Sequence, residues 1–585
     1  MSIISKIKRF IAITGVCAFA AFSGACSMEK ENNEYADLNS YLFIYNVGEN
    51  QGAAVIVNGE AAGSGMVKDG KYYISYTGLR EYIDDHFYWD NTENVLTYAS
   101  SRHIYDAVAG STEYTADGTV RQMDGVIAAT VEDEAYVSVD FVMEMNGSLD
   151  IKTYSEPNRI VINTADTVQA VKVESDTKLR TDKGVSYTIA ADLSKGKELY
   201  VLEDKGSWSF VYCQDGIMGY VENSEISDAT EKTIEKGQWW MDTEPYTYIA
   251  SDEQICLGWH QMEYEAGNDS FGSVTSGNDQ LNVISPTWFK LTDSYGGISS
   301  LASKLYVNKA HNSGLQVWGL INDFTYDEDG NYYVNQVVKV TSSRRRLIEN
   351  IISEAKECGM DGINVDFEMI RLAAAEGYVQ FVRELAIECE RENLVLSVDM
   401  YVPTESNQYY DRESIGEVAD YLIIMGYDEH WSGCSQAGSV ASLPYVTQGI
   451  LDTLEEVESS RVINAIPFYT RVWYEDSPEN APDGAVIVED AVNGDYALSS
   501  KAVGMGTAKE LLTENGATLR WLEEQGQYYG EYYIDGRLAR IWLEDKESLS
   551  AKLNVMKENN LAGVACWKLG LESDEAWEAI EEYLK

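Results

Sequence analysis

The sequence has little of what metal sites and disulfide frameworks are built from. It contains five histidines and eight cysteines in 585 residues, and no two cysteines have C-x-x-C spacing. Cys17 and Cys26 lie near the N-terminus, and the other six are scattered: Cys213, Cys256, Cys358, Cys389, Cys434 and Cys566. We therefore expect no metal cluster and no dense set of disulfides, and buried apolar thiols are the better interpretation.

Positive charge is also scarce. There are 44 Lys and Arg against 96 Asp and Glu, which gives a formal charge of −52. A polyanion repels phosphate backbones and anionic lipid headgroups, so we expect neither nucleic-acid binding nor membrane docking through a basic patch. A hydrophobic fraction of 45% and 40 tyrosines exclude a disordered acidic chain. At about 150 residues per domain, the length predicts about four folded domains.

The N-terminal segment 1–25 differs from the rest of the chain. Basic residues at positions 6, 8 and 9 precede an apolar stretch of 12 residues, 11–22, and small residues lead from it to Cys26. This layout is typical of an export signal, because the stretch is shorter than the ~20 residues that span a bilayer. We expect an exported protein of the cell surface, wall or medium, either free or lipid-anchored at Cys26, with no later membrane span.

Residues 39–165 form a predicted small α+β domain with an internal duplication. The string YISY at 73–76 recurs 63 residues later as YVSV at 136–139. Each copy predicts a strand that enters a short helix, and each is followed by another strand, at 94–98 and 159–162.

An aromatic run, His86 to Trp89, lies inside this duplicated domain. It could form a platform for sugars, but packing within a small domain is the better interpretation. The segment resembles the N-terminal stalk module of copper amine oxidases, which implies a spacer or binding module. No copper chemistry is carried over, because no set of metal ligands is present.

Residues 170–226 alternate apolar and polar positions between closely spaced turns, for example at Lys195-Gly196 and Gly206-Ser207. Such spacing predicts a small all-β barrel. The segment resembles a bacterial SH3-like domain, a module often found on wall-acting enzymes. The resemblance implies retention at peptidoglycan, with a plain spacer as an equal alternative. The polar stretch 227–243 is interpreted as the linker that follows.

Residues 244–585 alternate strands with helices and predict a (β/α)8 TIM barrel, whose active site would lie at the C-terminal ends of the strands. The connection after the seventh strand, 469–562, is long enough to carry an insertion. Within it, an aromatic hairpin with a turn at Asp535-Gly536 could wall a cleft. The eight predicted strands are 255–264, 281–289, 315–323, 362–368, 395–401, 421–427, 462–468 and 563–569.

The string DGINVDFE, 361–368, is the most informative pattern in the chain. Alternation along a strand places Asn364, Asp366 and Glu368 on one face and apolar residues on the other. In a barrel strand covered by helices, the polar face must point to the barrel axis. Burying two carboxylates there costs several kcal/mol unless they are paired or used, which favours a catalytic role over a half-exposed edge strand.

DGINVDFE resembles the signature of glycoside hydrolase family 18, the chitinase family. Other strings agree in order along the barrel: LNVISPTWF, VWGLIND, MGYD, AIPFYTRVW and GVACWKLG. The wording is similar to the spore-cortex branch of the family, N-acetylglucosaminidases that act on peptidoglycan during germination. The resemblance covers the whole C-terminal region and is far more specific than a single motif.

This resemblance implies a role for each matching residue. Glu368 matches the general acid, and Asp366 matches the residue that orients the substrate's 2-acetamido group. That group is the nucleophile in this family, so no second carboxylate need attack. Tyr427 matches a phenol that hydrogen-bonds the acetamido group, and Trp567 matches the hydrophobic floor under the distorted sugar.

One position departs from the family's commonest pattern, because Asn364 stands where many chitinases have Asp. An Asn can hydrogen-bond Asp366 without adding a third buried charge, so we expect the reaction type to be unchanged. Four further candidates for substrate contacts are equally compatible with core packing or structural ion pairs: Met425, Asp428, Trp288 and Arg471.

The expected function is that of a retaining, substrate-assisted β-N-acetylglucosaminidase that cleaves β-1,4 bonds after GlcNAc in bacterial peptidoglycan, in the cell wall or the spore cortex. Chitin oligomers and the GlcNAc-GlcNAc core of N-glycans are alternative substrates. A lectin on an inactive scaffold is the alternative from another class. We expect no cofactor, no metal, no nucleic acid, a monomer, and membrane contact only through an N-terminal lipid.

Overall fold

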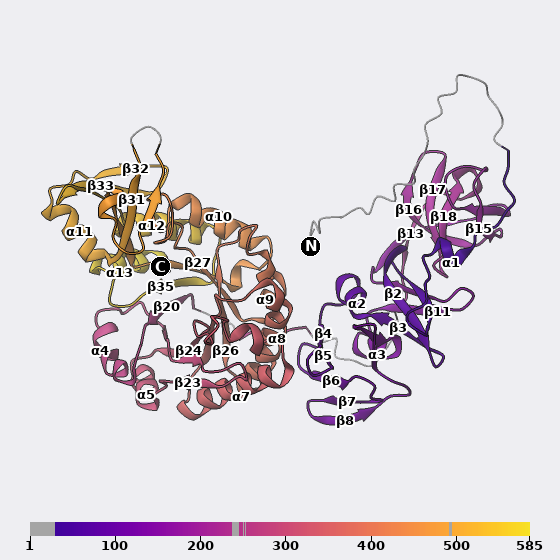
Figure 1. Ribbon diagram of the computed structural model, residues 1–585, viewed down its shortest axis with the longest axis horizontal. Helices are drawn as coiled ribbons and strands as arrows, with labels where there is room; N and C mark the ends of the chain where they lie inside the picture. Colours follow the sequence, from indigo (N-terminus) through magenta and orange to yellow (C-terminus); the bar gives the residue numbers. More distant parts are fainter. Residues whose placement is uncertain (1–29, 237–244, 250, 252, 491–493) are drawn as a thin grey trace, which may run out of the picture. The chain divides into compact units, whose positions relative to one another are not determined.

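The computed structural model describes two compact units, which divide between Pro245 and Tyr246 (Figure 1). The predicted signal peptide and Cys26 lie outside the described residues. No helix among the described residues is both long and apolar enough to cross a membrane. The described residues are 30–236, 245–249, 251, 253–490 and 494–585.

The duplicated part of the N-terminal unit folds as the repeat predicts. Strand β3 (Lys71–Ser75) runs into helix α2 (Tyr76–Tyr82), and strand β10 (Glu134–Ser138) runs into helix α3 (Val139–Met145). The two repeated strands pair with each other in antiparallel register, with Ile74 opposite Val137. Both side chains are fully buried in one core, so each copy covers the apolar face of the other.

Two sheets complete this part of the unit. The predicted strands at 94–98 and 159–162 are confirmed as β5 and β12, and Phe87 of the aromatic run is fully buried, as packing requires. The seven-stranded sheet adds β1 (Gln51–Val57), β2 (Glu60–Lys68), β9 (Ala128–Val131), β11 (Asp150–Tyr154) and β12 (Arg159–Asn163) to β3 and β10. The five-stranded sheet contains β4 (Phe87–Asp90), β5 (Val95–Ala99), β6 (Ile104–Val108), β7 (Glu113–Ala116) and β8 (Thr119–Gln122).

The rest of the N-terminal unit is an all-β sheet of seven strands, in the order β15-β14-β18-β17-β16-β13-β19. Its strands are β13 (Thr167–Lys172), β14 (Thr177–Arg180), β15 (Ile189–Leu193), β16 (Glu198–Asp204), β17 (Trp208–Cys213), β18 (Met218–Glu222) and β19 (Thr230–Thr233). The predicted linker is therefore wrong at 230–233, because β19 pairs with β13 and satisfies an edge that would otherwise be open. The linker residues 237–243 lie outside the described residues.

The domain boundary predicted at residue 39 also differs from the structure. Helix α1 (Leu38–Tyr41) packs through Leu38 and Tyr41 against the core of the all-β sheet, and Tyr35 forms a β-bridge with Ile189. The segment that precedes β1 is thus attached to the all-β part as well as to the duplicated part. Chain order could not show this, because the contact joins residues about 150 positions apart.

The C-terminal unit is a closed barrel of eight parallel strands, and all eight predicted strands are confirmed. Pairing of β21 with β24 closes the ring. The strands are β20 (Ile255–His260), β21 (Val283–Pro286), β24 (Gln316–Asn322), β25 (Gly362–Asp366), β26 (Val395–Tyr401), β27 (Tyr421–Met425), β28 (Val462–Pro467) and β35 (Gly563–Trp567). Most end one to four residues before the predicted ends, where the chain turns into the loops that carry the site.

Helices cover the outside of the barrel (Figure 1). The longer ones are α5 (Lys304–Asn312), α7 (Thr341–Cys358), α8 (Ala375–Glu392), α9 (Arg412–Val418), α10 (Leu443–Leu454), α12 (Lys546–Glu558) and α13 (Asp574–Leu584). Two short strands, β22 (Phe289–Leu291) and β23 (Ile298–Ser300), extend the sheet beside β24. The main core lies between the strands and this helical layer.

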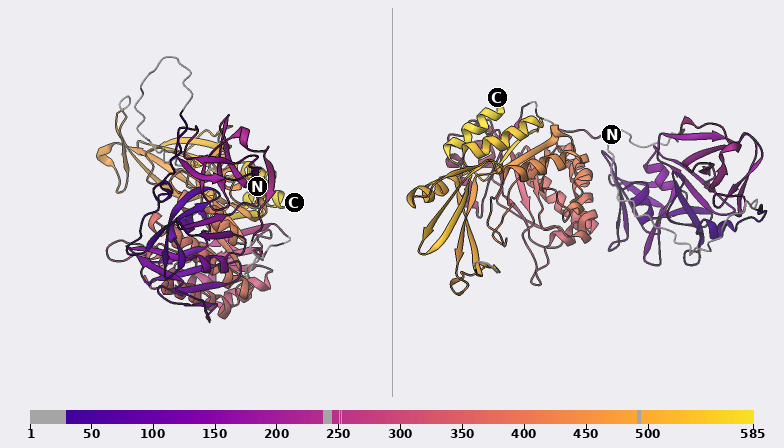
Figure 2. Two further views of the ribbon diagram at one scale, coloured as in Figure 1. Left: turned by 90° about the vertical axis from the view of Figure 1, so that its right-hand side faces the viewer. Right: turned by 90° about the horizontal axis from the view of Figure 1, so that it is seen from above.

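The predicted insertion after the seventh strand is confirmed. It forms a separate six-stranded sheet with helix α11 (Met505–Glu514), and this sheet projects from the barrel in both views of Figure 2. Asp535 and Gly536 form the predicted turn, both with positive φ, which suits a two-residue hairpin. The strands are β29 (Tyr469–Asp476), β30 (Val486–Val488), β31 (Tyr496–Gly504), β32 (Arg520–Leu522), β33 (Gln527–Ile534) and β34 (Arg537–Leu543).

Candidate active site

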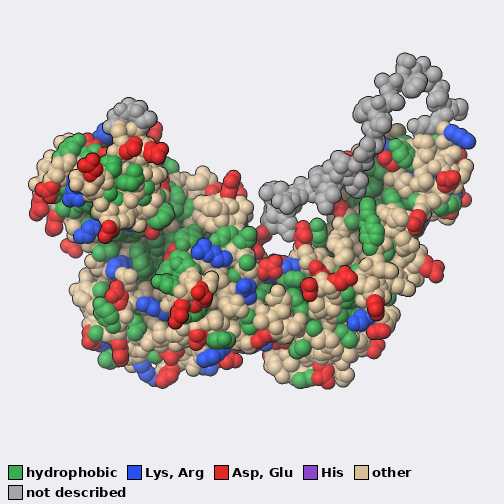
Figure 3. Space-filling model, viewed as in Figure 1, with side chains coloured by type: hydrophobic (Ala, Val, Ile, Leu, Met, Phe, Trp, Pro, Cys, Tyr) green, Lys and Arg blue, Asp and Glu red, His purple; other side chains and the backbone are tan. Residues whose placement is uncertain are grey.

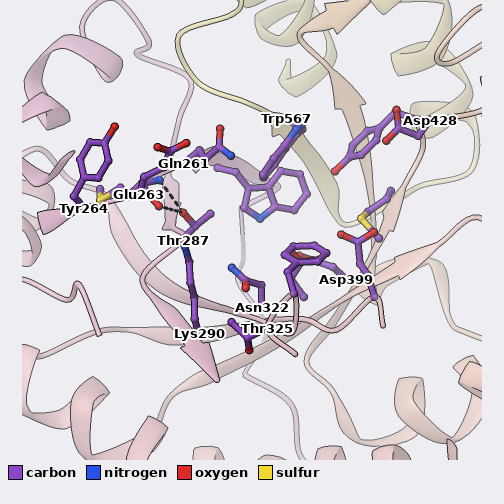
Figure 4. A pocket seen from close by; sticks show the side chains of 17 residues that line it. Gln261, Glu263, Tyr264, Thr287, Lys290, Asn322, Thr325, Asp399, Asp428 and Trp567 are labelled. Carbon is purple, nitrogen blue, oxygen red and sulfur yellow. Dashed lines mark hydrogen bonds between the residues drawn. The ribbon is translucent and has the colours of Figure 1, made fainter. Parts of the chain in front are cut away.

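A cleft of about 610 Å³ opens at the C-terminal ends of the barrel strands (Figure 4). Six of the nine residues singled out from the sequence line it: Asp366, Glu368, Met425, Tyr427, Asp428 and Trp567. The remaining lining residues are Trp259, Gln261, Met262, Glu263, Tyr264, Thr287, Lys290, Asn322, Phe324, Thr325 and Asp399. No residue of the aromatic hairpin in the insertion is among them, so the hairpin does not wall this part of the described chain.

Strand β25 aims the two carboxylates into the cleft. Phe367, between them in sequence, is buried on the opposite face and stacks on Phe381 of α8, with ring centroids 5.3 Å apart. With Phe367 anchored in the helical layer, the alternation of the strand directs Asp366 and Glu368 towards the barrel axis. This is the arrangement that the string DGINVDFE predicts.

Asp323 fixes the point where the chain leaves β25. It is fully buried, and its two oxygens accept the backbone N–H groups of Glu368 (3.0 Å) and Met369 (2.8 Å). Burial raises the pKa of Asp323 to about 7, although these two hydrogen bonds oppose the rise. Asp323 was not predicted; its position at the end of the third strand, in VWGLIND, was the available signal.

The pKa values of the carboxyl pair are raised by their surroundings. Burial raises the pKa of Asp366 well above its usual range, and the charges of Glu368 and Asp399 add to this effect. Burial also raises the pKa of Glu368; a hydrogen bond from Tyr401 opposes the rise and Asp428 reinforces it. A carboxyl with a raised pKa can hold a proton near neutral pH, as a general acid must.

Asn364 lies beneath the cleft and makes different contacts from those expected. Its Oδ1 accepts hydrogen bonds from Trp259 Nε1 (2.8 Å) and Ser285 Oγ (3.1 Å), and its Nδ2 donates to Asp399 Oδ1 (2.8 Å). The expected bond to Asp366 is therefore wrong. The reason is depth, because Asn364 sits one layer below Asp366 and level with its partners on neighbouring strands.

Asp399 is a site residue that sequence reasoning missed. It is buried on β26, and burial raises its pKa well above the usual range despite the hydrogen bond from Asn364. The signal was present, because Ser397, Asp399 and Tyr401 alternate along the fifth strand as polar residues on one face. Asp399 and Tyr401 thus surround the carboxyl pair from the next strand.

Aromatic side chains shape the cleft around the acids. Trp567, at the end of β35, lies edge-on to Trp259 with ring centroids 5.7 Å apart. Tyr427 follows β27 and lies edge-on to Tyr469, whose hydroxyl donates to Asp428. In Figure 4, Trp567 stands at the top of the cleft, with Asp399 and Asp428 on one side and Lys290 and Thr325 on the other.

The structure does not bring two of the weaker candidates into the cleft. Trp288 is 1% exposed in the main core, where its Nε1 donates to Asn268 Oδ1 (3.0 Å). Arg471 lies on β29 and donates from Nε to Ser500 Oγ (2.8 Å). For Trp288, the core-packing alternative therefore holds.

One group of side chains in the described residues is close enough to share a cation. It consists of Asp84, Asp85 and His86 in the N-terminal unit, away from the barrel. Asp84 is already engaged there, since it lies 2.8 Å from His86 Nδ1 and accepts a hydrogen bond from Asn146 Nδ2 (2.8 Å). The cleft chemistry described above uses carboxyl and phenol groups alone.

Comparison with known sequences places the chain in a family. Residues 270–572, about half of the chain, match the family described as glycosyl hydrolases family 18. Uncharacterized glycosylase YvbX of Bacillus subtilis is 26% identical over 330 residues, which cover 54% of this chain and 88% of that protein. The cortical fragment-lytic enzyme of the same species is 26% identical over 268 residues, which cover 45% of this chain and 57% of that protein.

Solved structures of similar fold include two with informative titles. Chitinase from Chromobacterium violaceum aligns with a TM-score of 0.47 and 19% identity, over 57% of this chain and 99% of that chain. The Bacillus cereus spore cortex-lytic enzyme SleL aligns with a TM-score of 0.48 and 18% identity, over 68% of this chain and 90% of that chain.

Proposed function

The chain belongs to glycosyl hydrolases family 18, and on that premise we propose that it is a retaining β-N-acetylglucosaminidase that cleaves the β-1,4 bond after GlcNAc in bacterial peptidoglycan. That it is a glycoside hydrolase follows from the family; the bond and the substrate are the proposal. The similarity to the cortical fragment-lytic enzyme supports a wall glycan as substrate.

One observation carries the proposal. Asp366 and Glu368 point into one cleft from a single strand, and burial raises the pKa of both. The positive charge that would stabilise two ionised carboxylates must come from the substrate, because the charges that shift these pKa values are all those of other acids. An oxocarbenium-like transition state and a cationic intermediate supply such a charge.

The reaction then proceeds in two steps. In the first, Glu368 gives its proton to the glycosidic oxygen while the acetamido oxygen of the GlcNAc attacks C1, so that the C1–O bond breaks and an oxazolinium ion forms. Asp366 accepts the acetamido N–H and balances the positive charge, and the Tyr427 hydroxyl donates to the acetamido group. In the second step, Glu368 takes a proton from water as the water attacks C1, which restores the acetamido group with retained configuration.

Trp567 and the N-terminal unit have supporting roles in this proposal. The indole face of Trp567 packs on the C–H bonds of the distorted sugar. The N-terminal unit holds or spaces a monomeric catalytic barrel at the wall of the cell or spore, with the exported chain either free or anchored through Cys26.

The proposal is tested by digesting purified spore-cortex peptidoglycan, intact and pre-cleaved by a lytic transglycosylase. Wild type and Glu368→Gln are compared, and the products are read by mass spectrometry. New reducing-end GlcNAc from wild type alone is expected. Release from chitin oligomers or N-glycans but not from peptidoglycan would replace the substrate, and binding without turnover on any glycan would overturn catalysis.

A further inference from the structure

Lys290 is the one Lys or Arg among the 17 residues that line the described cleft. It stands out in a chain with 44 basic and 96 acidic residues, where a cation readily finds a carboxylate. Figure 3 shows acidic side chains spread over the visible face of the molecule, with fewer basic ones between them. Even so, Lys290 forms no ion pair or hydrogen bond with any described residue.

The fold holds this lysine in place. Its neighbours on β22, Phe289 and Leu291, are 0% and 1% exposed and anchor the strand in the core. Alternation therefore directs Lys290 to the opposite face, which is the cleft. β22 is also held on both sides, with Lys290 opposite Ser299 of β23 and beside Asn322 of β24.

Acidic groups near Lys290 in sequence or in the cleft are otherwise engaged or lie apart. Asp293 caps the turn that follows β22, where Oδ1 accepts the N–H groups of Tyr295 (2.8 Å) and Gly297 (3.0 Å). Glu263 is on the same wall, but Thr287 lies between it and Lys290 in Figure 4. Lys568, by contrast, is engaged, because it donates to Gln261 Oε1 (2.6 Å).

Lys290 is also not the partner of the catalytic acids. No lysine is among the charges that shift the pKa of Asp366 or Glu368. The ammonium is thus available to a group of the substrate other than the one being cleaved. A strongly hydrated cation on a polysaccharide-binding wall matches an anionic group on the glycan.

We propose that Lys290 binds a carboxylate carried by a sugar that neighbours the cleaved bond, and so makes the cleft selective for anionic over neutral GlcNAc glycans. The inference rests on the proposed function, since peptidoglycan offers such carboxylates and chitin does not. The carboxylate belongs either to the lactyl ether of N-acetylmuramic acid or to the peptide attached to it.

The test measures kcat/KM on three glycans of equal length. They are a peptidoglycan oligosaccharide stripped of peptide, which exposes the lactyl carboxylate, the same oligosaccharide with its peptide, and a neutral chitooligosaccharide. Full-length wild type is compared with Lys290→Met and Lys290→Arg. Lys501→Met, which changes an exposed lysine of the insertion outside the cleft, is the matched control.

Lys290→Met is expected to lower the ratio of anionic to neutral kcat/KM about tenfold, which corresponds to about 1.4 kcal/mol. The loss should fall on KM rather than kcat, because the contact exists in ground state and transition state alike. Lys290→Arg should keep most of the ratio, and added salt should reduce the wild-type ratio. The glycan that shows the larger change identifies the lactyl or the peptide carboxylate as the partner.

The failures of the two proposals are distinguishable. An unchanged ratio in Lys290→Met, with wild type cleaving peptidoglycan, overturns this inference and leaves the proposed function standing. Equal losses on the anionic and neutral glycans also overturn it, because they show a structural role. Wild type that cleaves neither anionic glycan overturns the proposed function and the inference together.

Discussion

The barrel unit buries carboxylates in two places, and the two places treat them in opposite ways. Between α7 and α8, Glu384 is fully buried beside Arg344, with its Oε1 accepting from Arg344 Nε (3.0 Å) and Nη2 (2.8 Å). Burial alone would raise the pKa of Glu384, but the charges of Arg344 and Arg345 outweigh it and lower the pKa.

In the cleft, buried carboxylates have no such partner. Burial raises the pKa of Asp366 and Asp399 well above the usual range, and neighbouring acids add to the rise. Burial of a charge therefore marks function only where nothing in the fold compensates it, since a compensated charge has a structural explanation. The following predictions test this contrast.

The largest effect is expected for Glu368→Gln, which keeps the shape of the side chain and removes its proton. Turnover of a natural glycan should fall on the order of 10³-fold, the range for loss of a general acid. The unfolding temperature should not fall, because Glu368 has no cationic partner to lose. Initial rates and thermal unfolding of the same preparations measure both. Residual activity within tenfold of wild type would remove Glu368 from the acid role.

The next largest effect is expected for Arg344→Met, which leaves Glu384 buried without its main partner. The free energy of unfolding of the barrel unit should fall by about 3–5 kcal/mol. The double variant Arg344→Met/Glu384→Met should recover most of the loss, because it removes the uncompensated charge. Urea denaturation at neutral pH measures the difference. A loss below about 1 kcal/mol would show that this pair is not what holds α7 and α8 together.

A smaller effect of opposite sign is expected for Asp399→Asn. Because the folded-state pKa of Asp399 is raised, its ionised form destabilises the folded state at pH above the ordinary aspartate range. The substitution should therefore stabilise the protein by about 1 kcal/mol at pH 8. The gain should vanish as the pH falls towards about 4, where both states are protonated.

The matched comparison for Asp399→Asn is Glu384→Gln, which removes a carboxylate that has partners. Its folded-state pKa is lowered, so its ionised form stabilises the folded state at pH above the ordinary glutamate range. Glu384→Gln should therefore destabilise the protein at pH 8. The two unfolding curves at pH 8 give the answer directly, and shifts of the same sign would refute the contrast.

The smallest effect is expected in the pH profile, where two conservative variants should move the alkaline limb in opposite directions. Asp428→Asn removes a charge that raises the pKa of Glu368, so Glu368 should lose its proton at lower pH. Tyr401→Phe removes a hydrogen bond that lowers the same pKa, so the limb should move to higher pH. The measurement is kcat against pH, and movement of both limbs in one direction would contradict the assignment of Glu368.

The fold of the barrel was predictable from local pattern, and the site only in part. All eight strands and the hairpin turn at Asp535-Gly536 follow from alternation and turn chemistry within a few residues. Asp323 and Asp399 were missed, because each acts on β25 from a neighbouring strand. A single strand does not reveal which polar residue of its neighbour lies at the same depth.

Trp288 and the strand at 230–233 show the same limit from the other side. A tryptophan at the end of a barrel strand suits a sugar or a core equally well, and only packing against Tyr306 assigned Trp288 to the core. The polar segment 230–233 has no alternation of its own, and it became a strand because β13 offered an open edge.

The sequence by itself determined the family, the order of the barrel strands and the direction in which Asp366 and Glu368 point, because a strand's alternation is a local property of the backbone. Only the tertiary structure decided which buried charges are paired, how far Asn364 lies below the reacting carboxyls, and that Lys290 faces the cleft without a partner. These are properties of distance between residues far apart in the chain, and electrostatic interactions depend on distance and burial rather than on order.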